Sequence, residues 1–469
     1  MQPAEHRSRT RLHFVGIGGI GMSGIAEVFL NQGYPVSGSD VAESELTRRL
    51  ASLGATIAVG HDAANVRGVS VVVISSAVRA TNPEVVEARR LGVPVIPRAE
   101  MLGELMRGKT GVAVAGTHGK TTTTSMMATV FTTAGLDPTL VIGGRVDSLG
   151  GNAKLGKGDF VVAEADESDG SFLHLPATFG VITNIDNDHL DHYGSVAAVE
   201  DAFVEFVANL PFYGLVAVCA EDAGVRRCLP RFSKPVTTYG FSSEWDFCAQ
   251  DVQKISQGSK FLVTGRELPG GPHKTLGQIE LQIPGRHNVL NALAVVAISL
   301  RAGISFAQIA QGLREFGGVR RRFEIKWRST ERNRVIVDDY GHHPTEIRAT
   351  LSAARDFWPG RIVTVFQPHR YSRTQNCRDD FAAAFGNTDV LLMTDIYSAG
   401  EEPIEGVTAS ALLELVMQAE GVRLTGEYLS SLDEAADALD RIACDGDLIL
   451  CLGAGSITRL SEKLLEKMK

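Results

Sequence analysis

The sequence has few cysteines, no long apolar run and no excess of basic residues. Its six cysteines are scattered through 469 residues without a C-x-x-C pair. This spacing argues against a disulfide framework or a zinc ribbon and predicts buried, reduced thiols. No stretch of about 18 apolar residues occurs, so no membrane-spanning helix is expected. Residues 1–11 are polar and lack the apolar core of a signal peptide, which predicts a cytoplasmic protein.

The charge balance is mildly acidic. There are 46 basic and 55 acidic residues, a net charge of −9, and this disfavours a general nucleic-acid or anionic-membrane surface. Glycine is abundant, with 49 residues, or about one in ten against a usual share of about 7%. Many tight turns and close backbone approaches are therefore expected, as in α/β nucleotide-binding proteins.

Short β-branched runs alternate with amphipathic stretches that are long enough for helices. The runs are residues 12–17, 69–74, 112–115, 160–163, 181–183, 335–337, 362–366, 390–394 and 448–452, and the helical stretches include 83–91, 196–210, 345–357 and 432–444. Such alternation predicts the α/β class, with mainly parallel sheets covered by helices on both faces. Residues 242–284 are polar and glycine-rich, which predicts an irregular or antiparallel segment.

Two breaks divide the chain. Residues 106–110 are a short polar stretch before a new strand, and residues 316–322 combine a Gly-Gly hinge with a basic cluster. At roughly 150 residues per domain, the length also predicts about three domains. The expected domains are residues 1–108, 109–316 and 317–469.

The first glycine motif, G-I-G-G-I-G at residues 16–21, follows an apolar run. Gly16, Gly18 and Gly21 fit G-x-G-x-x-G, Gly19 lies between them, and Asp40 ends a second run about twenty residues later. A tight turn at a helix N-terminus favours a diphosphate. On the pattern alone a dinucleotide is the leading interpretation, and a turn that packs strand on helix is the simpler alternative.

The second motif, V-A-V-A-G-T-H-G-K-T-T-T-T, spans residues 112–124. It is a shortened phosphate-binding loop, G-x-x-G-K-T from Gly116, because Val114 stands where the standard motif has glycine. Lys120 would reach the β- and γ-phosphates of ATP, and the Thr121 hydroxyl would bind Mg²⁺. A lysine at a helix N-terminus opposes the helix dipole unless an anion is present, which favours nucleotide binding over a plain capped turn.

Two polar runs follow later strands of the same region. Four carboxylates occupy residues 164–169, and Glu164, the first polar residue after the strand, is the preferred Mg²⁺ ligand. The run T-N-I-D-N-D-H-L-D-H, residues 183–192, has three interpretations. His189 and His192 could belong to a transition-metal site, the aspartates could cap a turn, or His189 could lie near a second Mg²⁺.

Two asparagines open a very apolar helix at residues 284–294. A buried, unpaired Asn would cost about 1–3 kcal/mol. Capping explains Asn288 more easily than Asn291, so Asn291 is a candidate nucleotide contact.

The last domain has two polar segments after apolar strands, residues 337–346 and 366–374. Arg370 and Arg373 are three apart and could clamp a carboxylate through charge-assisted hydrogen bonds. With Tyr340, His342 and His369 they predict a pocket for a small substrate.

Taken in order, these motifs resemble the Mur ligase family across essentially the whole chain. The resemblance lies in G-T-H-G-K-T-T-T-T, A-E-A-D-E-S-D, the D-H pair after T-N-I, G-R-H-N-V-L-N-A, R-R-F-E, D-D-Y-G-H-H-P-T-E and Q-P-H-R-Y-S-R-T. It implies a Rossmann-like UDP-sugar domain, a central P-loop-type ATPase-like domain and a Rossmann-like domain that binds the amino acid. It also implies that the diphosphate at residues 16–21 is that of UDP rather than NAD.

The resemblance further implies an ATP-dependent ligase. It would join L-alanine to the lactyl carboxylate of UDP-N-acetylmuramate through an acyl phosphate, the first peptide-adding step of peptidoglycan precursor synthesis. The implied ATP-binding residues are Gly116, Thr117, His118, Gly119, Lys120, Thr121, Thr122, Asn291, Arg322 and Asp339. Lys120, Glu164, His189, Asn291 and Arg322 would be catalytic, and Thr121, Glu164 and His189 would hold two Mg²⁺ ions. Gly16, Gly18, Gly19, Gly21, Asp40 and Ser75 would bind the UDP-sugar, and Tyr340, His342, Arg370 and Arg373 the amino acid.

One departure from many relatives narrows the implied activity. Several Mur ligases use a carbamylated lysine for the second metal, whereas this chain has no lysine between Lys157 and Lys234, as in the alanine-adding members. Three alternatives remain open: a family member that attaches a whole tripeptide to the same UDP-sugar, an NAD-dependent oxidoreductase, and a non-catalytic ATP-binding regulator. The expected state is a monomer or a homodimer without nucleic-acid partners.

Overall fold

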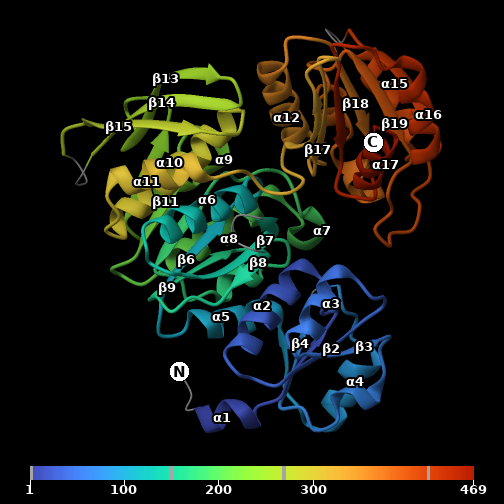
Figure 1. Ribbon diagram of the computed structural model, residues 1–469. Helices are drawn as coiled ribbons and strands as arrows, with labels where there is room; N and C mark the ends of the chain where they lie inside the picture. The colour runs from blue at the N-terminus through green and yellow to red at the C-terminus, as the bar shows by residue number, and fades with distance from the viewer. Residues whose placement is uncertain (1–3, 76, 147–150, 267–270, 420–422, 469) are drawn as a thin grey trace. The chain divides into compact units, whose positions relative to one another are not determined.

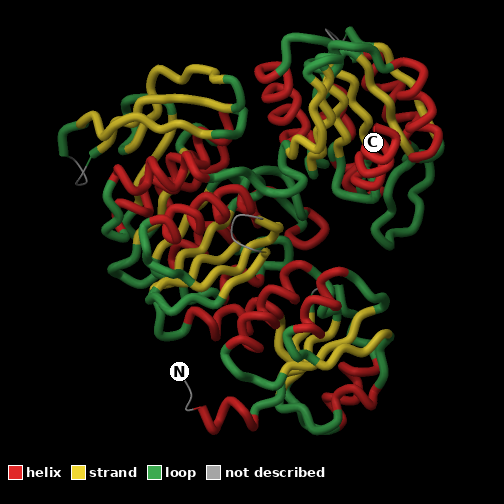
Figure 2. Tube along the Cα trace, in the orientation of Figure 1, coloured by secondary structure: helices red, strands yellow, loops and turns green. Residues whose placement is uncertain are grey.

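The computed structural model describes residues 4–75, 77–146, 151–266, 271–419 and 423–468. The chain forms two compact units. The first comprises Met1–Gln250, Leu262–Ile279 and Leu290–Phe316, and the second comprises Asp251–Phe261, Glu280–Val289 and Gly317–Lys469. Three sheets organise these units, and strands and helices alternate along most of the chain (Figures 1 and 2).

The first sheet has five parallel strands in the order β3-β2-β1-β4-β5. Its strands are β1 (Leu12–Val15), β2 (Val36–Asp40), β3 (Thr56–Val59), β4 (Val71–Ile74) and β5 (Val95–Pro97). The helices of this region are α1 (Ala4–Arg9), α2 (Ile20–Asn31), α3 (Glu45–Ser52), α4 (Pro83–Arg90) and α5 (Arg98–Met106). Strand β1 ends two residues earlier than its apolar run suggests, because Gly16 turns the backbone with φ 76°.

The second sheet has ten strands in the order β15-β14-β13-β12-β11-β10-β6-β9-β7-β8. They are β6 (Thr110–Ala115), β7 (Thr139–Val146), β8 (Gly151–Lys154), β9 (Phe160–Glu164), β10 (Phe179–Ile182), β11 (Leu215–Cys219), β12 (Val236–Gly240), β13 (Phe247–Ile255), β14 (Gly258–Gly265) and β15 (Lys274–Leu281). The central strands run parallel, and the edge strand β8 is antiparallel to its neighbour β7. The predicted irregular segment, residues 242–284, therefore forms three strands. Two residues connect β13 to β14, a link that only antiparallel strands allow.

The helices of this region are α6 (Lys120–Thr133), α7 (Leu190–Tyr193), α8 (Val196–Ala208), α9 (Ala223–Cys228), α10 (Arg286–Arg301) and α11 (Phe306–Glu315). Helix α6 carries the phosphate-loop motif at its start and is buried along most of its length. It packs tightly against α11, since a Cβ atom at Gly312 would lie 2.7 Å from the Val130 Cα. This packing fixes the position of the loop that precedes α6.

The third sheet, in the second unit, has six strands in the order β16-β17-β21-β18-β19-β20. They are β16 (Glu324–Ser329), β17 (Arg334–Asp339), β18 (Ile362–Phe366), β19 (Val390–Thr394), β20 (Thr425–Leu429) and β21 (Leu448–Leu452), of which only β16 is antiparallel to its neighbour. The helices are α12 (Pro344–Phe357), α13 (Tyr371–Asn376), α14 (Arg378–Ala382), α15 (Ala409–Gln418), α16 (Leu432–Ile442) and α17 (Thr458–Met468).

Helices cover both faces of this sheet. Val337 of β17 shares a core with Leu351 of α12, while its neighbour Ile336 shares a separate core with Leu439 of α16. Adjacent side chains of a strand point to opposite faces, so each face is buried by its own helices. The predicted α/β class with mainly parallel sheets is confirmed.

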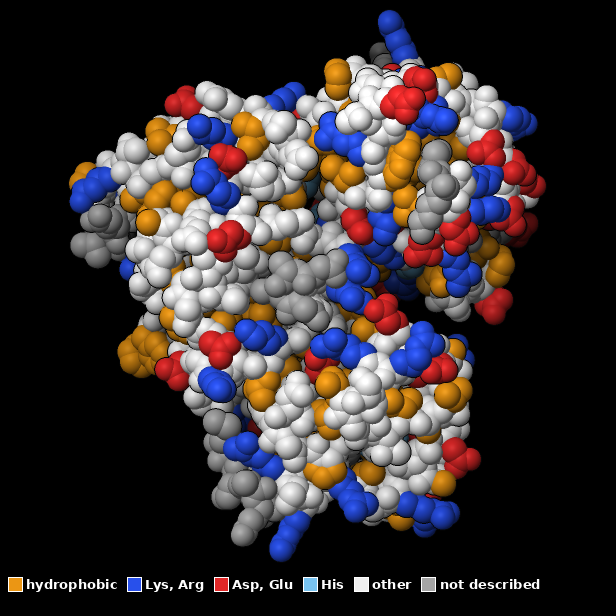
Figure 3. All heavy atoms as spheres, viewed as in Figure 1, with side chains coloured by type: hydrophobic (Ala, Val, Ile, Leu, Met, Phe, Trp, Pro, Cys, Tyr) orange, Lys and Arg blue, Asp and Glu red, His pale blue; other side chains and the backbone are white. Residues whose placement is uncertain are grey.

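Other expectations concern the cysteines and the membrane. All six cysteines are free thiols; five are buried as predicted, and Cys444 is exposed. Across the described ranges, no helix combines the length and apolar character that crossing a bilayer requires. On the face drawn in Figure 3, acidic and basic side chains are interspersed rather than segregated by sign.

Candidate functional site

The loop before α6 requires glycine at two positions. Gly116 has φ 125°, and a Cβ atom there would lie 2.0 Å from the Thr183 Oγ1. Gly119 has φ 82°, and its Cβ would lie 3.0 Å from the Asn291 Oδ1. The backbone therefore turns in a left-handed conformation while two polar side chains pack closely against it.

The segment after β10 holds this loop in place. The Thr183 hydroxyl donates a hydrogen bond to the His118 carbonyl at 2.6 Å, and the His118 amide donates to the Asn184 side chain at 2.8 Å. The Thr117 amide donates to the Asn184 carbonyl at 3.1 Å. Two amides of the predicted phosphate loop are thus engaged by Asn184. The amides of the first turn of α6 lack intrahelical partners, and they are the donors suited to an anion.

Lys120 begins α6 and lies within a cluster of carboxylates. Its ammonium group contacts the Glu167 carboxylate at 2.7 Å and donates to the Gly116 carbonyl at 2.7 Å. Burial lowers the pKa of Lys120, but the charges of Glu167, Asp166 and Glu164 outweigh burial and raise the pKa above its ordinary value. The positive charge at the helix N-terminus is therefore balanced by the protein itself, so the sequence argument that it needs a bound anion does not hold.

The four carboxylates of residues 164–169 have different partners. The Glu164 carboxylate accepts a hydrogen bond from the Gly143 amide at 3.0 Å, and Asp166 pairs with Arg98 at 3.1 Å. Asp169 accepts from the Ser171 amide and so closes a local turn. Glu167 is 1% exposed and contacts Lys120. It belongs to the predicted acidic run, but its spacing from the strand did not indicate this contact.

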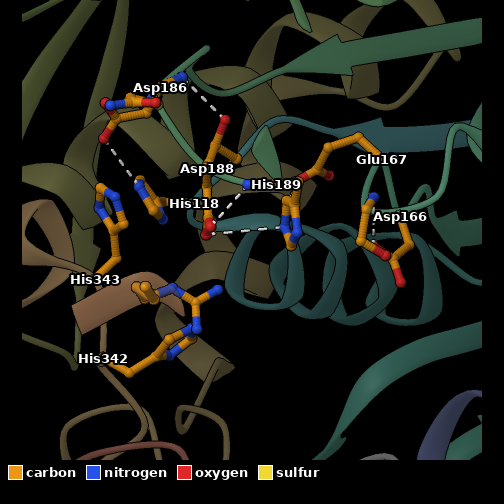
Figure 4. Close-up of polar contacts among 12 residues, drawn as sticks. His118, Asp166, Glu167, Asp186, Asp188, His189, His342 and His343 are labelled. Atoms are coloured by element: carbon orange, nitrogen blue, oxygen red, sulfur yellow. Dashed lines mark hydrogen bonds and ion pairs between the residues drawn. The ribbon is translucent and has the colours of Figure 1, made fainter. Parts of the chain in front are cut away.

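The histidines of residues 183–192 point to different surroundings. Figure 4 shows His189 beside Asp188 and Glu167, and its Nε2 lies 3.6 Å from the Glu167 Oε1. The His192 ring instead packs edge-on against Tyr193. Asp186 contacts the His118 Nε2 at 3.0 Å (Figure 4). The structure therefore brings His189, and not His192, toward the carboxylates near Lys120.

The two asparagines of α10 also differ in their surroundings. The Asn288 amide donates to the Pro284 carbonyl at 2.6 Å, a local bond that explains its burial. Asn291 lies against Gly119, at the phosphate-loop motif.

A separate cleft of about 670 Å³ lies at the carboxyl ends of the first sheet. Gly16, Gly18, Gly19, Asp40 and Ser75 of the predicted UDP-sugar set line the cleft. Gly21 does not line it, because its Cβ position faces the Arg98 guanidinium at 2.9 Å. The Asp40 carboxylate accepts a hydrogen bond from the Gly18 amide at 2.8 Å and thereby shapes the glycine turn.

The second unit brings together the residues predicted to bind the amino acid. The His342 and His369 rings lie 5.5 Å apart, and an Arg373 Nη1 lies 3.4 Å from the His369 Nδ1. Burial, Arg373 and Arg370 lower the pKa of His369 to about 4, so the imidazole is neutral near pH 7. Arg370 pairs with Glu401 at 2.5 Å, a partner that the sequence spacing did not indicate.

Arg322 and Asp339 also lie in this unit. The Arg322 guanidinium lies 5.0 Å from the centre of the Tyr340 ring and 3.4 Å from Glu346. Asp339 is buried and accepts hydrogen bonds from the amides of Phe323 and Gly341, and its pKa is raised by burial. The Asp339 carboxylate, at the end of β17, is thus hydrogen-bonded to the residue that precedes β16.

Together, a glycine loop before a helix, a lysine among carboxylates and a separate glycine-lined cleft are the features of an α/β nucleotide-binding protein. Three family models match in chain order: the Mur ligase family catalytic domain at residues 11–110, the Mur ligase middle domain at 114–299 and the Mur ligase glutamate ligase domain at 321–455. The chain belongs to the Mur ligase family.

Relatives match over the full length. The chain is 54% identical to the UDP-N-acetylmuramate–L-alanine ligase of Geobacter sp. (strain M21) and 52% identical to that of Geotalea daltonii, with 98% of each chain covered. Among solved structures it resembles the UDP-N-acetylmuramate–alanine ligase of Thermotoga maritima, with TM-score 0.82, 33% identity, and 98% and 99% of the two chains covered. A murein peptide ligase from Psychrobacter arcticus matches with TM-score 0.71 and 25% identity over 97% and 98%.

Proposed function

We propose that this chain joins L-alanine to the lactyl carboxylate of UDP-N-acetylmuramate, with conversion of ATP to ADP and phosphate. The observation that carries the proposal is identity above 50%, over nearly the whole length, to relatives named for this reaction. The tripeptide-adding alternative has weaker support, because the murein peptide ligase matches with lower identity and a lower TM-score than the alanine ligase. We also propose that residues 1–108 bind the UDP-sugar, 109–316 bind ATP and 317–469 bind the amino acid.

The chemistry explains why ATP is needed. A free carboxylate is a poor electrophile, so its oxygen attacks the γ-phosphorus of ATP, and ADP leaves. The neutral amine of alanine then attacks the acyl phosphate, and the tetrahedral intermediate expels phosphate to leave the amide. The first step forces a carboxylate toward a triphosphate, and each pair of like unit charges at 4 Å repels by about 4 kcal/mol at an effective dielectric of 20.

The loop at residues 116–121 has hydrogen-bond donors for the phosphates in that step, namely the Lys120 ammonium and the first-turn amides of α6. Lys120 is already placed there by the Gly116 carbonyl and by Glu167. The first-turn amides of α6 add partial positive charge at the same point. Asn291 lies against this loop, which supports a contact between its side chain and the bound nucleotide. We propose that these groups hold and polarise the γ-phosphate.

Mur ligases require Mg²⁺ as well as ATP, and the donors of this region suit it. Glu164 ends β9, which pairs with β6, the strand that leads into the loop. The Glu164 carboxylate and the Thr121 hydroxyl, in the first turn of α6, therefore both follow the carboxyl ends of neighbouring strands. The carboxyl groups of Glu164, Asp166 and Glu167 all lie near Lys120 and offer oxygen atoms of the kind that Mg²⁺ prefers. We propose Thr121, Glu164 and His189 as the magnesium ligands, in two sites. Bound Mg²⁺ would neutralise phosphate charge.

In the second unit, Arg373 is 8% exposed and lies beside a neutral His369, which favours binding of the alanine carboxylate by a desolvated guanidinium. Tyr340, His342 and Arg370 are proposed to complete that pocket. Both ATP and UDP-sugars are cytoplasmic metabolites, which supports a cytoplasmic location.

The decisive measurement is phosphate release with ATP, Mg²⁺ and UDP-N-acetylmuramate. Release should require L-alanine and should remain at background with a tripeptide of the peptidoglycan stem in its place. Glycine and L-serine test how strictly the amine is selected. Release with the tripeptide and not with alanine would assign the chain to the alternative activity, and no release with either would refute the ligase proposal.

A further inference from the structure

A buried carboxylate lies beneath the cleft of the first sheet. Glu84, in the first turn of α4, is completely buried and accepts hydrogen bonds from the Ser39 hydroxyl at 2.7 Å and the Asn65 amide at 2.7 Å. The His61 Nδ1 lies 2.9 Å from its Oε2, and the His13 Nε2 lies 3.4 Å from its Oε1. Burial alone would raise the pKa of Glu84, but His13 and the hydrogen bonds from Ser39 and Asn65 lower it to about 2. Glu84 is therefore an ionised acceptor at neutral pH.

The contacts of Glu84 determine which nitrogen of His61 carries the proton. An ionised carboxylate can only accept hydrogen bonds. The Ser39 hydroxyl already directs its single hydrogen at the same carboxylate. The His61 Nδ1 lies 3.0 Å from the Ser39 Oγ and 2.9 Å from the Glu84 Oε2. Neither oxygen has a hydrogen left to donate to it, so Nδ1 must be the donor. In the neutral imidazole the proton is thus on Nδ1, and Nε2 carries the lone pair.

The other nitrogen of His61 is available to a ligand. The His61 side chain is 23% exposed and lines the 670 Å³ cleft together with Gly16, Asp40 and Ser75. Within the described residues, the only hydrogen bonds of the His61 ring are those of Nδ1. The cleft therefore presents a hydrogen-bond acceptor at this point, and a fully ionised diphosphate offers no donor to it.

The topology indicates which part of a nucleotide His61 meets. The diphosphate turn follows β1, whereas His61 follows β3, two positions away in the sheet. At about 4.8 Å per strand, the two points are about 10 Å apart along the sheet edge. Asp40, which ends β2 between these two points, stands where dinucleotide-binding sites have the carboxylate that binds the ribose. A UDP-sugar bound by the glycine turn would therefore place its uridine, and not its phosphates or sugar, near His61. The donors of a uridine are the uracil N3–H and the ribose hydroxyls.

We propose that Glu84 is a positioning residue for nucleotide recognition: it holds the His61 proton on Nδ1, so that Nε2 accepts a hydrogen bond from an N–H or O–H group of the uridine. The inference rests on the proposed UDP-sugar specificity of this cleft. It assigns selectivity for uridine to a buried network from three segments of the chain: β2, the connection between β3 and β4, and α4. Its members are Ser39, His61, Asn65 and Glu84.

The test measures binding of UDP to the full chain by calorimetry. If the donor is the uracil N3–H, wild type should bind UDP about tenfold more tightly than N3-methyl-UDP. If the donor is the ribose 2′-hydroxyl, wild type should bind UDP about tenfold more tightly than 2′-deoxy-UDP. His61→Ala should weaken UDP binding about tenfold and remove that preference. Glu84→Gln should do the same, because its amide can donate to Nδ1 and allow the opposite tautomer. Glu87→Gln, on the same helix but outside the network of Glu84, is the matched control and should bind as wild type does.

A second measurement does not depend on the Glu84 variant folding. The ¹⁵N resonances of His61 in the wild-type chain at pH 8, assigned by comparison with His61→Ala, should show a protonated Nδ1 and an unprotonated Nε2. The opposite tautomer would overturn the proposal, and so would equal binding of all three nucleotides by wild type or an unchanged preference in His61→Ala.

The outcomes separate this inference from the proposed function. Turnover with UDP-N-acetylmuramate and alanine, combined with no uridine preference at His61, would refute the role of Glu84 and leave the ligase intact. In the folded Glu84→Gln variant, the KM for the UDP-sugar should rise about tenfold while kcat changes little, because only ground-state binding is lost. Rescue by raising the UDP-sugar concentration distinguishes this positioning role from a general loss of structure.

Discussion

Replacing Gly116 by alanine tests whether the phosphate loop depends on the backbone that the structure shows. The residue has φ 125°, which costs an L-amino acid at least about 1–2 kcal/mol. Its Cβ would also lie 2.0 Å from the Thr183 Oγ1 and 2.8 Å from the Thr183 amide nitrogen. Because one of these atoms belongs to the backbone, a side-chain rotation cannot relieve the clash. The loop must move and lose the 2.6 Å bond from Thr183 to His118, worth about 1 kcal/mol. The total expected loss in the free energy of unfolding is about 2–3 kcal/mol.

Two other glycines separate the contributions to this loss. Gly135, just after α6, has φ 80° and open space around its Cβ position, so Gly135→Ala should cost only the backbone term of about 1–2 kcal/mol and leave activity intact. Gly119 has φ 82°, but its Cβ would meet the Asn291 side chain at 3.0 Å, which can shift. Gly119→Ala should therefore have a modest effect on stability and a clear effect on ATP affinity.

The assays are urea denaturation of the full chain and ATP binding by calorimetry with Mg²⁺. Gly116→Ala should lose measurable ATP binding at temperatures where circular dichroism shows it folded, while Gly135→Ala should bind ATP as wild type does. Equal ATP affinity in Gly116→Ala and wild type would refute the reasoning, because the substituted loop could not then have the described conformation. Equal destabilisation by Gly116→Ala and Gly135→Ala would show that the Thr183 contact contributes nothing.

Three further predictions concern charge. Lys120→Ala should abolish substrate-dependent ADP formation, measured by a coupled assay, because the ammonium beside the phosphate loop is lost; full activity would remove the ATP site from residues 116–121. Arg373→Ala should raise the KM for alanine in steady-state kinetics far more than it lowers kcat, and an unchanged KM would exclude Arg373 from the amino-acid pocket. Glu84 has its pKa lowered from 4.5 to about 2, so its contribution to stability is complete above about pH 4.5 and is lost as the pH falls toward 2. The difference in unfolding free energy between wild type and Glu84→Gln should narrow by about 2 kcal/mol between pH 7 and pH 3, and a constant difference would contradict the ionised network.

Local patterns along the chain were sufficient for the class of fold. The β-branched runs at residues 362–366 and 448–452 form β18 and β21 with those bounds, because a strand buried on both faces needs continuous apolar residues. The phosphate loop could also be predicted from the sequence, because consecutive residues supply the end of β6, both glycines, Lys120 and the start of α6. Residues 242–284 were harder, since polar edge strands lack a continuous apolar signal.

What the sequence determined by itself was the order of strands and helices and the residue types that follow each strand. The tertiary structure alone decided which of these residues meet. Spacing favoured Glu164 as a magnesium ligand and gave no role to Glu167, which contacts Lys120 because the turn after β9 directs its side chain toward α6. Spacing grouped Arg370 with Arg373 as a possible carboxylate clamp, and only the folded chain shows that Arg370 also pairs with Glu401, thirty-one residues away. The physical reason is common to both cases. Periodicity reports which face of an element is buried, but contacts between segments depend on strand order and loop paths that only the packed chain establishes.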